Sequence, residues 1–133
     1  MGTFDAIGIA STGLTVHRKW LDAVSDNLAN ANNATSTDGA AFQARYVVAT
    51  SMDYGEPAGV QVAGIELGDP EGRLVHEPTH PLADEDGYVR YPDVDMASQM
   101  TQLIMAQRGY QASAAVVDRA RESYQSALQI GRN

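Results

Sequence analysis

The chain contains no cysteine, few aromatic residues and few basic ones. Its 133 residues include 7% aromatic residues and 9 Lys+Arg against 17 Asp+Glu, which gives a net charge of −8. The absence of cysteine excludes a disulfide framework, a thiolate metal site and a cysteine nucleophile. The negative charge argues against a nucleic-acid partner, because phosphate binding needs an excess of Lys and Arg. With so few aromatic residues, a large self-sufficient core is not assured.

Long apolar runs are also missing. The chain has no apolar stretch of 18 residues, so no membrane span is predicted. The first cation is Arg18 and the apolar stretch before it is short, so no cleaved secretory leader is predicted either. A chain of this length suits one modest domain, or two long helices with a small insert, and excludes a two-domain enzyme.

The negative charge is confined to the middle of the chain. Residues 50–93 hold ten acidic residues and only Arg73 and Arg90 as bases, whereas both ends are nearly neutral. This distribution predicts a solvated acidic insert between two ends that pack. We therefore expect three parts: an N-terminal helix with its junction (1–36), an acidic β-rich insert (37–92) and a C-terminal helix (93–133).

Both ends carry a heptad pattern, which predicts two long helices that pair as a coiled coil. Each heptad has two apolar rows, interrupted by His17 in the first helix and by Gln107 and Arg121 in the second. Pro92 and Asp93 or Asp95 suit the start of the second helix, and Gly131 suits its end. The expected packing positions are Ile7, Leu14, Leu21, Val24 and Leu28 in the first helix, and Met96, Met100, Leu103, Tyr110, Val117, Tyr124 and Leu128 in the second, with Ala10, Ala31 and Ala114 as small members of the rows.

A second apolar row on the C-terminal helix predicts contacts with other molecules. Ala97, Ile104, Val116 and further alanines lie beside the heptad seam, and one partner helix cannot cover both rows. Pairing of the two ends within one chain is the first expectation, and assembly with further helices is the second. The middle predicts short strands at 41–49, 60–67 and 88–91. The expected fold class is therefore mainly α with a small β insert.

No catalytic or metal site is predicted. His76 and His80 are four residues apart, but Pro78 and Pro81 prevent the helix that would place both imidazoles on one face. The acidic run 84–87 lacks the ligand pattern of a calcium loop and is expected to be a solvated turn. No nucleophile stands at a recognisable spacing from a base, so we expect no cofactor and no enzyme activity.

The most distinctive segment ends the first helix with four Asn in seven residues. One interpretation is ordinary, because Asn tolerates left-handed backbone and bonds locally at helix ends. The other is that Asn27 and Asn30 use their amides at a crowded junction.

This segment resembles the signature of the flagellar rod and hook family, here Asn27-Leu28-Ala29-Asn30 followed by Thr35. The stretches 38–44, 81–92 and 108–112 are similar to the short proximal-rod subunits of that family, and the resemblance spans essentially the whole chain. Two positions depart from the family pattern, since His80 and Ser113 stand where Asn is usual.

The resemblance implies a non-enzymatic building block of the bacterial flagellar basal body. It implies export through the flagellar type III apparatus without a cleaved leader, and helical ends that order only on assembly into a torque-bearing tube across the periplasm. The implied partners are further copies of the chain, rod subunits of the FlgB, FlgF and FlgG types, and a FliE-type adaptor.

Two alternatives remain open from the residues alone. A small cytoplasmic adaptor that dimerises through its heptads would show the same periodicity. An enzyme with an unrecognised site would draw on His17, His76 or His80.

Overall fold

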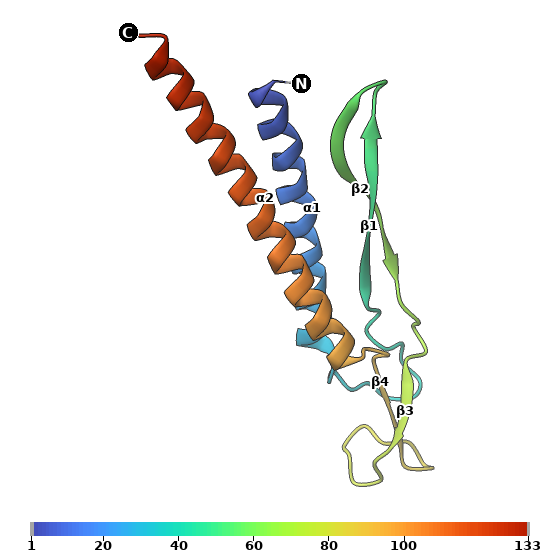
Figure 1. Ribbon diagram of the computed structural model, residues 1–133. Coiled ribbons are helices and arrows are strands. Elements are labelled where there is room, and N and C mark those ends of the chain that lie inside the picture. The colour runs from blue at the N-terminus through green and yellow to red at the C-terminus, as the bar shows by residue number, and fades with distance from the viewer. Residues whose placement is uncertain (1, 133) are drawn as a thin grey trace.

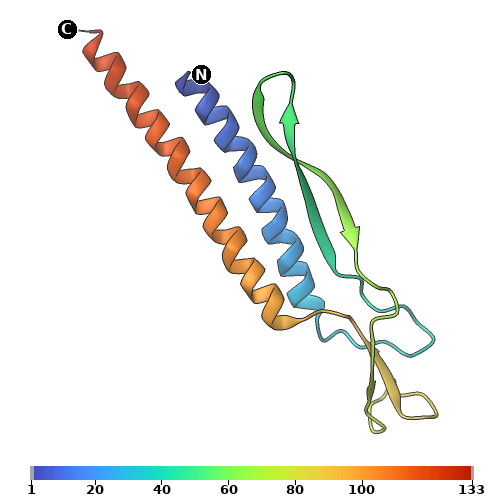
Figure 2. The ribbon, with the colours of Figure 1, turned by 45° about the vertical axis from the view of Figure 1, so that its right-hand side comes forward.

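The computed structural model describes residues 2–132, and two long helices dominate it (Figure 1). Along the chain the elements are α1 (Thr3–Asn30), β1 (Arg45–Asp53), β2 (Pro57–Leu67), β3 (Arg73–His76), β4 (Tyr88–Tyr91) and α2 (Met96–Ile130). Helix α1 lies between α2 on one side and the β1–β2 hairpin on the other (Figures 1 and 2). The prediction of a mainly α fold with a small β insert is confirmed. Within the described residues, neither helix is long and apolar enough to cross a membrane.

At the N-terminal end of each helix, a carboxylate accepts a hydrogen bond from a backbone amide that has no partner within the helix. The Asp95 carboxylate accepts a hydrogen bond from the Ser98 amide at 3.2 Å, so Asp95 caps α2 as predicted. At the start of α1, the Asp5 carboxylate accepts from the Gly2 amide at 2.7 Å. Helix α2 ends one residue before Gly131.

The two helices run antiparallel. At one end the rings of Phe4 and Tyr124 meet edge to face with centroids 4.9 Å apart. At the other end the Asn27 amide donates to the Gln99 side chain at 3.1 Å. Residues near the two chain ends are therefore neighbours, and both termini lie at the same end of the molecule (Figure 2).

Small residues form the closest part of the helix pair. A Cβ on Gly13 would lie 2.8 Å from the Ser113 hydroxyl, and a Cβ on Gly109 would overlap the His17 ring. Ala106, between these contacts and the junction, is fully buried. The absence of larger side chains here lets the two backbones approach closely.

The residues that α2 turns towards α1 differ in part from the predicted seam. Gln99 and Ala106 are buried, whereas Met100 and Leu128 are about half exposed. On α1, Val24 is buried and Ile7, Leu14, Leu21 and Leu28 are half-buried. Hydrophobic periodicity follows large side chains, so it did not find a contact row made of Gln, Ala, Gly and Ser.

The β1–β2 hairpin contacts α1 through β2, close to the hairpin turn. Thr12 Oγ1 accepts a hydrogen bond from the Val60 amide at 3.0 Å, and it donates to the Ile9 carbonyl at 2.6 Å. Gly59 beside this contact has φ of 119°, and a Cβ there would overlap Thr12. Glycine is therefore required at position 59 on two counts, backbone conformation and space.

Strand β1 begins four residues later than predicted. Residues 41–44 do not pair with β2 but bond to the segment after it: the Ala41 amide donates to the Pro70 carbonyl and the Gly68 amide to the Ala44 carbonyl. Strand β4 lies where it was predicted, and its partner β3 was not predicted.

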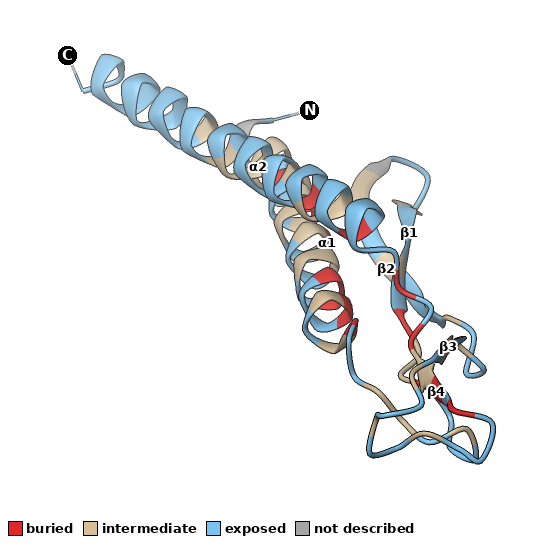
Figure 3. Cartoon of the chain, turned by 90° about the horizontal axis from the view of Figure 1, so that it is seen from below, coloured by how far each residue is buried: buried red, intermediate tan, exposed pale blue. Residues whose placement is uncertain are grey.

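The buried core is small and lies near the junction between the helices and the insert. Ala31, Ala44 and Val94 form its hydrophobic cluster, and Val89 and Pro92 are fully buried. Burial is concentrated at this end of the molecule, while the far half of α2 is exposed (Figure 3).

The antiparallel register can be tested with one disulfide, because the chain has no cysteine of its own. A Cβ on Gly13 lies 3.6 Å from Ser113 Cβ, and disulfides span about 3.5–4.5 Å between these atoms. We expect Gly13→Cys with Ser113→Cys to form an intramolecular disulfide, seen as faster migration on a non-reducing gel. Gly8→Cys with Ser113→Cys is the matched control, since a Cβ on Gly8 meets nothing within 4 Å. Equal cross-linking of both pairs would contradict the register.

The contact between His17 and Gly109 gives a second test. In the double-cysteine background, Gly109→Ala should slow disulfide formation because the new methyl group displaces the His17 ring. Adding His17→Ala should restore the rate, and Gly8→Ala, an equivalent substitution in open space, should leave it unchanged. A Gly109→Ala variant that cross-links as fast as its parent would show that the helices do not approach closely here.

Candidate functional site at the helix junction

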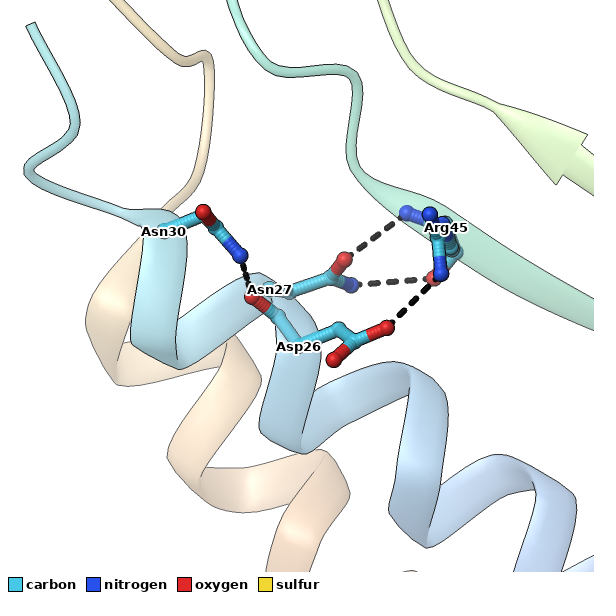
Figure 4. Close-up of polar contacts among 4 residues, drawn as sticks. All are labelled: Asp26, Asn27, Asn30 and Arg45. Atoms are coloured by element: carbon cyan, nitrogen blue, oxygen red, sulfur yellow. Dashed lines mark hydrogen bonds and ion pairs between the residues drawn. The ribbon is translucent and has the colours of Figure 1, made fainter.

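The side chain of Asn27 connects three elements at the lower end of α1. It is fully buried. Its amide nitrogen donates to the Arg45 carbonyl at 2.9 Å, and its oxygen accepts from the Arg45 amide at 2.8 Å (Figure 4). The same nitrogen also donates to Gln99 Oε1 at 3.1 Å. One amide therefore joins α1, the first residue of β1, and α2.

Asn27 acts on Arg45 as a neighbouring strand would. It takes both backbone groups of that residue, one as donor and one as acceptor, so the start of β1 is fixed against the helix. A buried polar group left without a partner costs about 1–3 kcal/mol. Loss of this side chain would leave the buried Gln99 side chain and the two part-buried backbone groups of Arg45 without these bonds.

The other predicted junction residues have different roles. Asn30 donates to the Asp26 carbonyl at 2.8 Å within its own helix, Leu28 is half-buried and Ala29 is exposed (Figure 4). Asp26 pairs with the Arg45 guanidinium at 2.7 Å, but both side chains are about half exposed, and such pairs contribute little. Thus Asn27 is the member of the signature that couples separate elements.

The Asn-rich segment does not use left-handed backbone. Among the described residues only glycines have positive φ, and Ala31, which ends α1, has φ of −58°. The left-handed part of the ordinary interpretation is therefore wrong, whereas local bonding is seen at Asn30, which donates to the Asp26 carbonyl.

Thr35 and Arg90 close the junction from the side of the insert. Their backbones form a two-bond antiparallel bridge, with Thr35 donating at 2.8 Å and Arg90 at 3.0 Å. The Arg90 guanidinium donates to the Glu71 carbonyl, and to the Thr37 carbonyl at 2.9 Å. Sequence reasoning did not single out Arg90, Arg45 or Gln99. The available signal for Arg90 was that it is one of only two bases in the acidic segment 50–93.

The histidines pack against aromatic rings. His76 meets the Tyr88 ring with centroids 5.1 Å apart, and His80 lies beside Tyr91 at 6.5 Å. His80 Nδ1 also accepts from the Leu82 amide at 3.1 Å. Over residues 2–132, no group of three or more His, Asp or Glu side chains is placed to hold a metal ion.

Asp84 organises the turn before β4. Its carboxylate accepts from the amides of Tyr88 at 2.8 Å and Asp86 at 3.0 Å. The bond from Tyr88 is the main cause that lowers the pKa of Asp84 below its usual value, because hydrogen bonds to a carboxylate favour the charged form. The pKa of Tyr91 is raised, since its hydroxyl donates to the Glu77 carboxylate at 3.0 Å. These groups stabilise the local fold and show no catalytic arrangement.

Large apolar side chains lie along one exposed side of α2. Met96, Met100 and Ile104, each four residues from the next, are about half exposed. We call these three residues the apolar face of α2. Tyr110 and Tyr124 are less exposed, and Leu103 and Val117 are half-buried. The junction holds the chain together through polar bonds, while this face remains uncovered.

Comparisons with known proteins identify the family. Residues 85–130 match the family described as flagellar basal body rod FlgEFG protein C-terminal. The chain is 33% identical to the flagellar basal-body rod protein FlgC of Escherichia coli O157:H7, over 99% of this chain and 100% of that protein. The chain belongs to the FlgC family of flagellar basal-body rod proteins. It is also 32% identical to the FlgC protein of Borreliella burgdorferi over 98% of both chains, and 29% identical to that of Bacillus subtilis over 99% of this chain.

The importance of Asn27 to this FlgC-family chain can be measured at a single amide. In Asn27→Ala, the Arg45 amide loses its acceptor, and we expect it to exchange with solvent up to about a hundredfold faster, as a loss of about 2–3 kcal/mol implies. Asn30→Ala is the control, because that side chain bonds only within α1. Nuclear magnetic resonance of the purified protein reports both rates. Equal protection of Arg45 in the two variants would contradict the coupling role of Asn27.

Proposed function

We propose that the chain is a structural subunit of the proximal rod of the bacterial flagellar basal body. Copies would assemble into the helical tube that transmits motor torque across the periplasm and so support motility. The family is structural and the chain is not an enzyme. Membership of the FlgC family over nearly the full length supports this proposal, and so does the apolar face of α2.

The uncovered surface of the single chain is the observation that carries the proposal. A compact monomer of 14.2 kDa should expose about 6,800 Å², whereas this chain exposes 8879 Å². The excess of about 2,000 Å² is more than the roughly 800 Å² that one partner contributes to a standard interface. A subunit that meets neighbours on more than one side needs such a surface.

The small core explains why order would come with assembly. The hydrophobic cluster consists of Ala31, Ala44 and Val94, and residues 121–130 are all exposed. Ordering a long helix costs conformational entropy, which this burial does not offset. We propose that the outer turns of both helices, furthest from the junction, are disordered in the free chain and become fixed as paired helices, with coiled-coil packing, when neighbours cover them.

The three parts of the chain fit different places in a tube. Residues 1–36 and 93–133 would supply the helices that pack towards the tube axis, and the acidic insert 37–92 would face outward. The proposed partners are further copies, rod subunits of the FlgB, FlgF and FlgG types, a FliE-type adaptor and the type III export apparatus. No nucleic-acid partner is proposed, in keeping with the net charge of −8.

The apolar face of α2 gives the direct test. Ile104→Asp should reduce incorporation into rods by about tenfold or more, because a charge would have to be buried against the neighbour. Gln111→Asp is the matched control, since it lies seven residues further on the same helix face and is already polar and exposed. Immunoblots of isolated basal bodies measure incorporation, and swimming in soft agar reports function.

The outcomes separate the alternatives. Ile104→Asp rods with normal content of the variant would show that the face is not an assembly contact. Basal bodies that never contain the wild-type chain would contradict the proposed function itself. A stable, fully ordered dimer of the purified chain would favour a soluble adaptor instead.

A further inference from the structure

An apolar groove runs along α1 between the hairpin tip and α2. It has a volume of about 560 Å³. Ile9 and Gly13 of α1 form its floor, Val60 of β2 forms one wall, and Ala112, Ser113 and Val116 of α2 form the other. Three elements therefore shape one hollow, which we call the α1 groove.

One end of the α1 groove is acidic. A neighbouring hollow shares Ile9 with it and is lined by Phe4, Asp5, Tyr54 and Glu56. The two carboxylates stand where the α1 groove opens towards the N-terminal end of α1 and the hairpin tip. A segment that combines apolar side chains with positive charge would complement this surface.

The last turns of α2 have those properties and lack a partner within the chain. The contact between Phe4 and Tyr124 lies near the start of α1, and α2 continues to Ile130 beyond it (Figure 2). In this overhang, Leu128 is 51% exposed and Ile130 is 77% exposed. Arg132 supplies positive charge, and residues 125–132 contain no acidic residue.

The overhang cannot fill the groove of its own chain. The groove wall at Val116 belongs to the same continuous helix, and Leu128 lies twelve residues further along it. At 1.5 Å per residue the separation is about 18 Å, directed away from the groove. An occupant of this kind must come from another molecule.

We infer that the overhang of one copy, residues 125–132, seats in the α1 groove of a second copy. Leu128 would bury against Ile9, Val60 and Val116, and Arg132, four residues further along, would face Asp5 and Glu56. Groove and overhang are different surfaces, so the contact is heterologous, and repetition of it builds an open helix rather than a closed dimer. The inference rests on the proposed function and names the contact by which copies join.

Cysteine pairs test the contact, since the chain has no other cysteine. The source bacterium would make only the variant Val60→Cys with Leu128→Cys, and isolated basal bodies would be oxidised. We expect a ladder of dimers and higher oligomers on a non-reducing gel. A mixture of the two single variants should stop at dimers, because each copy then carries one half of the contact.

The control pair is Val60→Cys with Met100→Cys. Met100 is 48% exposed, close to the 51% of Leu128, but it lies on the apolar face of α2. A ladder from this pair and none from Val60–Leu128 would show that the apolar face fills the groove, and would overturn the inference. Basal bodies that contain the variant but give no ladder would overturn it too, with the proposed function intact. Basal bodies that lack even the wild-type chain would refute the proposed function instead.

A second substitution keeps the test decisive if the cysteine variant fails to assemble. Leu128→Asp should lower incorporation into basal bodies by about tenfold or more, and Gln125→Asp, an exposed polar position in the same segment, should leave it unchanged. Normal incorporation of Leu128→Asp would overturn the inference.

Discussion

The structure depends on the close approach of two antiparallel helices through small residues. Gly13, Gly109 and Ala106 lie where α1 and α2 meet, and the His17 ring packs against the backbone of Gly109. A contact row of this kind brings the backbones together but removes little apolar surface from water. The larger apolar side chains of α2 are consequently left outside the pair, where they can stabilise contacts between molecules.

The junction compensates for this limited burial with directed polar bonds. Asn27 fixes β1 to both helices, and Arg90 fixes the insert through the carbonyls of Thr37 and Glu71. Hydrogen bonds specify geometry more sharply than apolar contacts do. The result is a chain whose buried groups gather at one end, from which the helix pair and the hairpin extend.

Sequence reasoning recovered the elements better than their contacts. Heptad spacing, Pro92 and Gly131 predicted both helices closely, and the aromatic and β-branched residues of 88–91 predicted β4. It placed the start of β1 too early, because residues 41–44 bond to residues 68–70 and not to β2. The contact row on α2 and the role of Gln99 depend on which small or polar residues meet in space. The spacing of hydrophobic residues does not predict these contacts.

The free turn of the β1–β2 hairpin has a consequence for the evolution of chain length. Residues 54–56 project beyond the contact of β2 with α1, and a Cβ on Gly55 meets nothing within 4 Å. The alignment with the Borreliella burgdorferi protein spans 149 positions against the 133 residues of this chain, so that relative contains inserted residues. Extra residues at this turn would lengthen the hairpin without shifting the register of the two helices. Chain length can therefore change at this turn while the packing between α1 and α2 is preserved.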